Sequence, residues 1–157
     1  MPHIPPTGVD AGPSSQLLDH RPEIRVAWEA LDDALLGPGS TLPVSLKENV
    51  RRSLASDLGC RFCASFGSPP AEPADSRESL AIAFAELAAE DHRSIGAPMF
   101  ETLREEFSDE EIVELCAWVC FKIGSNMLGA ILGLDPSTEE QRREYEAMLA
   151  DRAAATA

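Results

Sequence analysis

The stretch ENVRRSLASDLGCRFC, residues 48–63, sets the architecture of this chain because it joins a helical apolar pattern to a pair of thiols. Apolar residues that precede and enter it lie four apart, and this spacing predicts one stripe of an amphipathic helix that opens near Pro43. Gly59 is the natural end of that helix. The stripe consists of Leu46, Val50, Leu54 and Leu58.

Two cysteines follow this helix with two residues between them. If Cys60 opens a further helix, Cys63 lies one turn later on the same side, within disulfide reach. The free N–H groups and positive dipole at a helix start stabilise a thiolate and lower a cysteine pKa from about 8.5 into a range of roughly 3.5–7.5. The pair therefore predicts thiol redox chemistry. On the preceding helix, Glu48 has cations within reach at Arg51 and Arg52.

Helical patterns continue through the rest of the chain, and no alternating strand pattern occurs, so the predicted fold class is all-α. Ser108 with Glu111 is the clearest capping box, and we expect the long apolar helix after it to be central and nearly all buried. Ser137 with Glu140 is expected to cap the last helix. The other predicted helices begin near Pro22, Asp75 and Pro98.

The composition predicts one domain with two short ends. A chain of 157 residues that is 44% hydrophobic suffices for a single core. Residues 1–20 are rich in Pro, Gly and Ser and predict an extended N-terminal arm, whereas residues 21–152 form the helical domain. Residues 153–157 are expected to be a flexible C-terminus.

The net charge of -14 opposes phosphate backbones and anionic lipid surfaces, so nucleic acid and membranes are not expected partners. The first residues lack the basic and apolar regions of a signal peptide, which predicts a cytoplasmic protein. In that reducing compartment, four cysteines are not needed as structural disulfides.

Other interpretations of the cysteines remain open at this point. Cys60 and Cys63 could be two buried small residues, or half of a zinc site completed by Cys116 and Cys120. The second pair lies on an apolar helix, where a metal site would be unusual, so we expect it to belong to the core and expect no metal or cofactor. His92 has a sufficient explanation as a cation near a helix C-terminus.

Glu48 and Arg51, followed twelve residues after the glutamate by Cys60-x-x-Cys63, resemble the core of the carboxymuconolactone decarboxylase and alkylhydroperoxidase D (AhpD-like) superfamily. The flanks are similar to that superfamily as well. They are His20-Arg21-Pro22-Glu23, Phe107–Leu115 and Asn126, so the resemblance covers roughly residues 18–135.

This resemblance implies an AhpD-like antiparallel helical bundle that assembles as a homotrimer or homohexamer, with the dithiol at the start of a buried helix. It implies a peroxidase in which Cys63 attacks a small hydroperoxide, Cys60 resolves it as a disulfide and Glu48 relays protons. The electrons would come from a partner thiol protein. The pattern has a histidine four residues after the second cysteine, where this chain has Gly67. Activation of the thiol would then rest on Glu48, Arg51 and the helix dipole.

Two other functions stay open. One is a non-enzymatic helical oligomer whose cysteine pair is a passive redox sensor or a structural remnant, which Gly67 favours. The other is a lyase of the decarboxylase type, although nothing in the sequence marks a site for a lactone substrate.

Overall fold

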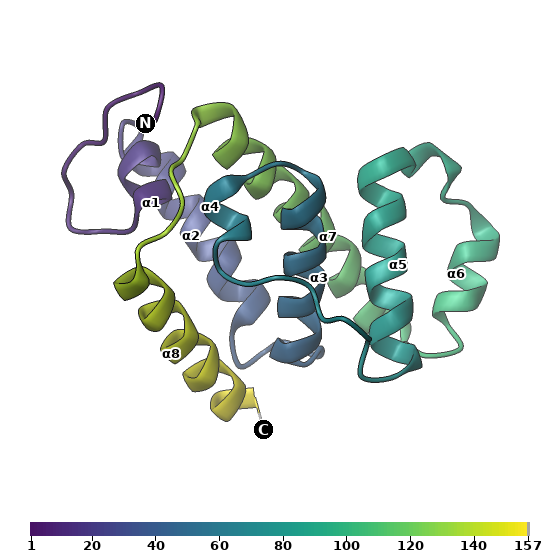
Figure 1. Ribbon diagram of the computed structural model, residues 1–157. Helices are drawn as coiled ribbons and strands as arrows, with labels where there is room; N and C mark the ends of the chain where they lie inside the picture. Colours follow the sequence, from purple (N-terminus) through teal and green to yellow (C-terminus); the bar gives the residue numbers. More distant parts are fainter. Residues whose placement is uncertain (157) are drawn as a thin grey trace.

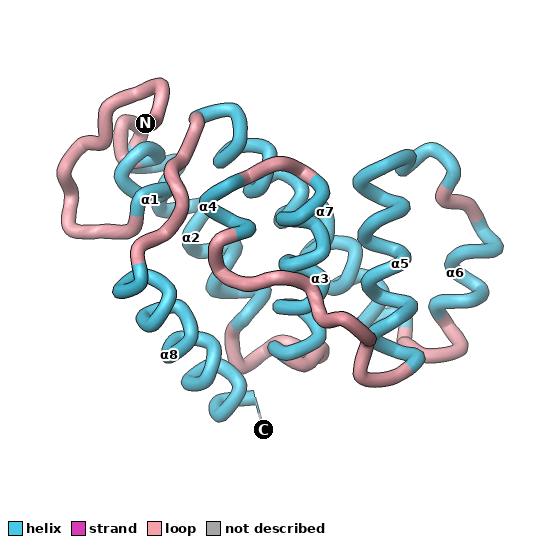
Figure 2. Tube along the Cα trace, in the orientation of Figure 1, coloured by secondary structure: helices cyan, strands magenta, loops and turns pink. Residues whose placement is uncertain are grey.

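A long helix, α7 (Asp109–Leu132), runs through the molecule, and the other helices are arranged around it (Figure 1). The computed structural model describes residues 1–156, and within them it contains helices and loops but no strand, which confirms the all-α prediction (Figure 2). The remaining α-helices are α1 (Pro13–Leu18), α2 (Pro22–Leu36), α3 (Val44–Asp57), α4 (Arg61–Ala64), α5 (Ser76–Asp91), α6 (Ala97–Leu103) and α8 (Glu139–Thr156). A short 3-10 helix, η1 (His92–Ser94), follows α5.

The start of α7 has the predicted capping box. The Glu111 N–H donates to Ser108 Oγ at 3.2 Å, and the Ser108 N–H donates to the Glu111 carboxylate at 2.8 Å. At the other end, Gly133 adopts a left-handed conformation with φ +69°, which satisfies the last carbonyls of the helix. Local signals in the sequence therefore set both ends of this helix.

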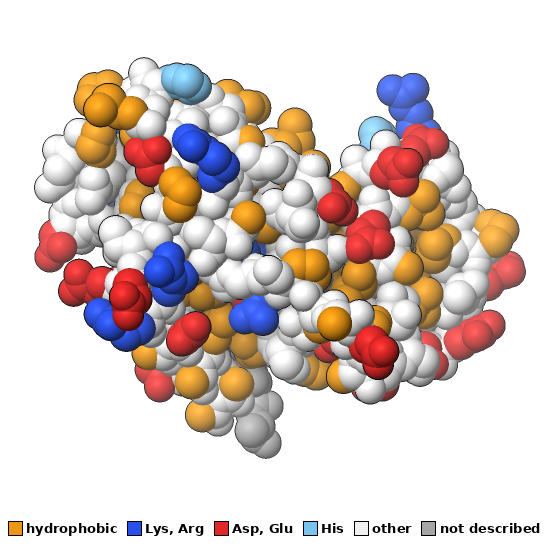
Figure 3. Space-filling view, in the orientation of Figure 1, with side chains coloured by type: hydrophobic (Ala, Val, Ile, Leu, Met, Phe, Trp, Pro, Cys, Tyr) orange, Lys and Arg blue, Asp and Glu red, His pale blue; other side chains and the backbone are white. Residues whose placement is uncertain are grey.

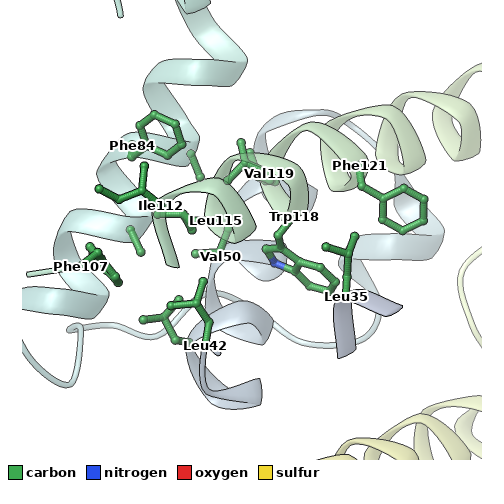
Figure 4. Packing of buried hydrophobic residues seen from close by; sticks show 14 of the residues in the cluster. Leu35, Leu42, Val50, Phe84, Phe107, Ile112, Leu115, Trp118, Val119 and Phe121 are labelled. Carbon is green, nitrogen blue, oxygen red and sulfur yellow. The ribbon is translucent and has the colours of Figure 1, made fainter. Parts of the chain in front are cut away.

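The core lies where α7 packs against α3 and α5. Trp118 is 1% exposed, and its indole N–H donates to the carbonyl of Lys47 on α3 at 2.9 Å, so this large side chain is buried with its polar atom satisfied. Figure 4 shows the cluster of buried apolar side chains to which Trp118 belongs, contributed by α2, α3, α5, α7 and the loops that join helices. The labelled members are Leu35, Leu42, Val50, Phe84, Phe107, Ile112, Leu115, Val119 and Phe121.

The expectation that α7 would be nearly all buried is wrong. Val113 and Ile131 are 68% and 66% exposed, and Met127 is 48% exposed. Cys120 is also exposed, so the expectation that it belongs to the core is wrong too. The reason is geometric: the neighbouring helices cover one side of α7 and leave an apolar stripe on the other. By length and composition alone α7 could cross a membrane, a property that it shares with the core helices of other proteins.

The sequence predicted an extended N-terminal arm, but part of this arm is helical. Residues 13–18 form α1, which packs against α2 and buries Leu17. The first residues lie beside the end of α7, where the His3 N–H donates to the carbonyl of Leu132 at 2.9 Å. Burial of Leu17 and a proline at the first helical position favour this helix over an extended chain.

The cap of the last helix lies one residue later than predicted, at Thr138 and not at Ser137. Thr138 and Gln141 cap it reciprocally, each side chain accepting the other's N–H, at 2.9 Å and 3.2 Å. Ser137 instead bonds through its hydroxyl to Ser65 at 2.6 Å, which ties the start of α8 to the loop after α4. Of the predicted flexible end, residues 153–156 continue α8, and residue 157 lies outside the described residues.

Candidate functional site

The two cysteines lie at the junction between α3 and α4, as the sequence predicted. Gly59 has φ +72°, which turns the chain sharply after α3, and Cys60 is the N-cap of α4. Cys60 Sγ accepts the backbone N–H of Cys63 at 3.2 Å. The sulfurs form a Cys60–Cys63 disulfide with the Cα atoms 5.2 Å apart. The short helix thus presents both sulfurs on one side.

The two sulfur-bearing side chains differ in burial. Cys60 is fully buried, whereas Cys63 is half-buried and lines a cavity of about 500 Å³. A molecule in this cavity would meet Cys63 first. The walls come mainly from α1, α2, α4 and α7, and Tyr145 contributes from α8. Their apolar members include Trp28, Phe62, Phe66, Phe121, Leu128 and Leu134.

Gly129 on α7 lets the dithiol pack against that helix. A Cβ atom at this position would lie 2.6 Å from Cys60 Sγ and 3.4 Å from Cys63 Sγ. Only a residue without a side chain allows so close an approach. Gly129 was missed in the sequence analysis. A glycine inside an otherwise regular helix could have indicated a close contact at this position.

Glu48 is buried at the centre of a hydrogen-bond network. Arg51 donates two bonds to its carboxylate, both at 2.8 Å, and Arg52 donates one at 2.8 Å. The Tyr145 hydroxyl donates another at 2.7 Å. Burial alone would raise the pKa of Glu48, but the hydrogen bonds and charge of Arg51, together with those of Tyr145 and Arg52, outweigh burial and lower it.

Arg51 connects this network to the dithiol. Its guanidinium donates to the backbone carbonyl of Cys63 at 2.8 Å while it holds Glu48 on its other side. The structure therefore brings the four predicted site residues together, with Glu48 linked to Cys63 through Arg51. A buried cation this close to Cys63 favours a thiolate there once the disulfide is reduced.

Tyr145 reaches the site from α8, and sequence reasoning missed it. Its ring packs against Phe66 with centroids 4.7 Å apart, and the Arg51 guanidinium lies 5.4 Å from the ring centroid. Burial raises the pKa of Tyr145; Arg51 opposes this rise and the Glu48 carboxylate adds to it, so the phenol stays neutral. The available signal was weak: Tyr145 is the sole tyrosine of the chain and lies on an amphipathic helix.

Gly67, where the resemblance places a histidine, has a conformation that disfavours a side chain. Its φ is +122°, and a Cβ there would lie 3.1 Å from the guanidinium of Arg52. Among the residues that line the cavity there is no histidine. His92 lies at the end of α5, which Figure 1 shows on the side of the molecule away from α8.

The second cysteine pair is separate from the first. Cys116 and Cys120 are free thiols on α7, and burial raises the pKa of Cys116, with a smaller contribution from Cys120. Within residues 1–156, no group of three or more His, Cys, Asp or Glu side chains is placed to hold a metal ion. The alternative of a zinc site built from both pairs therefore has no geometric support.

Comparison with solved structures shows which fold this is. An uncharacterized peroxidase-related protein from Silicibacter sp. TM1040 matches with a TM-score of 0.72 and 19% identity, over 80% of this chain and 76% of that one. A protein from Ralstonia eutropha JMP134, described as an alkylhydroperoxidase AhpD core and an uncharacterized peroxidase-related protein, matches with a TM-score of 0.68. It is 21% identical, over 79% of this chain and 76% of that one.

The fold is AhpD-like. The resemblance seen over roughly residues 18–135 is thereby confirmed at the level of the fold. No protein-family model matches the sequence, and no curated protein matches it. At about 20% identity this similarity shows the fold alone, because one fold can carry different chemistry.

Proposed function

We propose that this protein is a thiol-dependent peroxidase that reduces small organic hydroperoxides through Cys60 and Cys63. The observation that carries the proposal is the difference between the two sulfurs: Cys63 opens on the cavity, and Cys60 lies buried within bonding distance of it. Both AhpD-like neighbours are described as peroxidase-related proteins, and this supports the choice.

The proposed cycle has three steps, which are attack on the hydroperoxide, formation of the disulfide and reduction of the disulfide. The Cys63 thiolate attacks the terminal oxygen of the hydroperoxide, so that an S–O bond forms, the O–O bond breaks and the alkoxide takes up a proton to leave as an alcohol. The Cys60 thiol then displaces hydroxide from the sulfenic acid of Cys63, which releases water and forms the disulfide. Two thiol groups of a partner protein reduce the disulfide by exchange.

In this proposal Glu48 acts by orienting Arg51. The resemblance implied a proton relay through this carboxylate, but a carboxylate with a lowered pKa that already accepts four hydrogen bonds is a poor proton acceptor. Instead it holds Arg51 against the Cys63 carbonyl, and Arg51 supplies the positive charge that favours the thiolate.

Steady-state consumption of cumene hydroperoxide with dithiothreitol as reductant tests the proposal. Wild type should turn over slowly, and Cys63→Ser and Cys60→Ser should each abolish turnover. Cys120→Ser is the matched control and should leave the rate unchanged, because Cys120 lies on the outer side of α7. Absence of turnover in folded wild type would refute the proposal.

A passive redox sensor is the second candidate, and Gly67 favours it because the position of the histidine is taken up by Arg52. A sensor would form the Cys60–Cys63 disulfide under mild oxidation without turning over hydroperoxide. Among the described residues, the structure adds none that would mark a site for the lactone substrate of a decarboxylase.

We also propose that the protein works in the cytoplasm as a homotrimer or homohexamer. Exposed apolar side chains on α2 and α7 support assembly, because monomers rarely leave such surfaces in contact with water. These side chains are Ile24, Val26, Leu31, Val113, Met127 and Ile131.

A further inference from the structure

The side-chain amide of Asn126 has an acceptor without a donor. Asn126 is 1% exposed, and its Nδ2 donates to the carbonyl of Lys122 on the same helix at 2.7 Å. Its Oδ1 has no hydrogen-bond partner, and it is the only such atom among the buried side-chain nitrogens and oxygens of residues 1–155. An unpaired buried acceptor is unfavourable and needs an explanation.

The orientation of this amide is set by its neighbours. The Lys122 carbonyl can only accept, so Nδ2 must face it and Oδ1 is turned away from it. Asn126 lines the same cavity as Cys63 and lies one helical turn before Gly129, which approaches both sulfurs. The residue that carries the free acceptor therefore belongs to the wall beside the dithiol.

The charged groups of the cavity wall are already paired. Lys122 bonds to Asp32 at 2.5 Å, and Arg51 is held by Glu48. Glu29 bonds to Arg25 at 3.2 Å. Asp33 is paired with Arg152 from α8. An ionic ligand would have to break one of these pairs, whereas a neutral ligand with one donor group would complete the wall.

We propose that Asn126 Oδ1 determines ligand specificity by accepting the O–H of a neutral hydroperoxide with an apolar body, and of the alcohol that the reaction leaves behind. The aromatic walls, among them Trp28, Phe62 and Phe121, surround the body of the ligand. The reaction part of this inference rests on the proposed function. The binding part does not, because an alcohol carries the same donor without reacting.

Three probes of similar shape distinguish the contribution of the hydrogen bond to affinity from the contribution of apolar packing. They are 2-phenyl-2-propanol, its methyl ether, which lacks the donor, and 2-methyl-2-phenylpropanoate, which carries a charge. NMR titration of the wild-type disulfide form should give about threefold to tenfold tighter binding of the alcohol than of the ether, the effect of one neutral hydrogen bond. The carboxylate should bind more weakly than the alcohol.

Asn126→Leu keeps the volume and removes the acceptor, so the preference for alcohol over ether should disappear. Ser125→Ala is the control: Ser125 also lines the cavity, but its hydroxyl already donates to the Phe121 carbonyl at 2.7 Å, so the preference should remain. With cumene hydroperoxide, Asn126→Leu should raise KM by a similar factor and change kcat less.

Equal affinity of wild type for alcohol and ether would overturn the inference, and this result does not depend on whether Asn126→Leu folds. A preference that persists in Asn126→Leu would overturn it as well. Failure of the proposed function is distinguishable, because a protein that prefers the alcohol but consumes no hydroperoxide has the binding site without the peroxidase activity.

Discussion

The hydroxyl of Tyr145 on α8 donates to the buried carboxylate of Glu48 on α3 at 2.7 Å. This bond joins the last helix to the site, since Glu48 in turn holds Arg51 against Cys63. Tyr145 lies beyond residues 18–135, the part of the sequence that resembles the superfamily, and it brings the C-terminal helix α8 into the site.

Tyr145→Phe should therefore weaken both the fold and the site. It keeps the ring against Phe66 but removes one bond to a buried carboxylate, which should lower the free energy of unfolding by about 1–2 kcal/mol. Tyr145→Leu should cost more, because it also removes the ring. Urea denaturation measures both, and a Phe variant as stable as wild type would show that the hydroxyl contributes nothing.

Gly129→Ala should separate α4 from α7. The added methyl group would lie 2.6 Å from Cys60 Sγ, and relieving this overlap should cost about 1–3 kcal/mol of unfolding free energy and slow disulfide formation. Gly124→Ala is the control on the same helix: a Cβ there meets nothing within 4 Å, so stability should rise by up to about 1 kcal/mol. Similar losses in both variants would contradict the close approach.

Gly67→His should fail to restore an imidazole to the site. The backbone at Gly67 has φ +122°, and the side chain would meet Arg52, so we expect a loss of about 1–3 kcal/mol in stability and no gain in turnover. Gly39→Ala, at an open position, is the control and should be nearly neutral. Faster peroxide consumption by Gly67→His would show that Arg52 moves aside.

Stability should fall in acid through Glu114. Burial would raise its pKa, but hydrogen bonds from Lys47, Ser40 and Thr41 lower it from 4.5 to about 2. A folded-state pKa below the unfolded value adds stability that is present above pH 4.5 and lost as the pH falls toward 2.

Glu114→Gln should therefore be less stable than wild type at neutral pH, by at least about 1–2 kcal/mol after allowance for solvent screening. This difference should narrow as the pH falls from about 4.5 toward 2. Glu110→Gln, an exposed position on the same helix, is the control. Denaturant titrations across this pH range measure the free energy of unfolding. A difference between wild type and Glu114→Gln that stays constant with pH would contradict the role of the Glu114 carboxylate.

The apolar stripe on α7 should mediate assembly. Ile131→Glu puts a charge on a residue that is 66% exposed in the isolated chain, so it should dissociate the expected trimer or hexamer without unfolding the domain. Ala71→Glu, in the exposed loop after α4, should leave the assembly intact. Light scattering at micromolar concentration measures both, and a monomeric wild type would contradict the proposed oligomer.

The sequence allowed prediction of those features that depend on neighbouring residues. Helix ends such as Ser108 with Glu111 are local hydrogen-bond patterns, and four site residues lie within residues 48–63, so their proximity follows from one helix and one turn. Tyr145 and Gly129 could not be found this way, because their positions depend on how distant helices pack. Asn126 was recognised as part of the resemblance, but its place in the cavity wall depends on the same packing.

Packing also explains the errors. An all-round apolar helix predicts burial on every side, but only one side of α7 is covered within a single chain, which leaves Val113 and Cys120 exposed. Similarly, the Pro- and Gly-rich composition of residues 1–20 predicts an extended arm. The arm is helical at α1 because burial of Leu17 against its neighbours stabilises that helix.

One single-turnover measurement tests the peroxidase cycle most directly. Fully reduced protein is mixed with one equivalent of cumene hydroperoxide, and the intact mass and the modified residue are determined by mass spectrometry. Wild type should lose two hydrogens through a Cys60–Cys63 disulfide, Cys60→Ser should gain one oxygen on Cys63, and Cys63→Ser should stay unchanged at Cys60. Oxidation of Cys60 in Cys63→Ser at the wild-type rate, or a wild-type protein that remains reduced, would contradict the account.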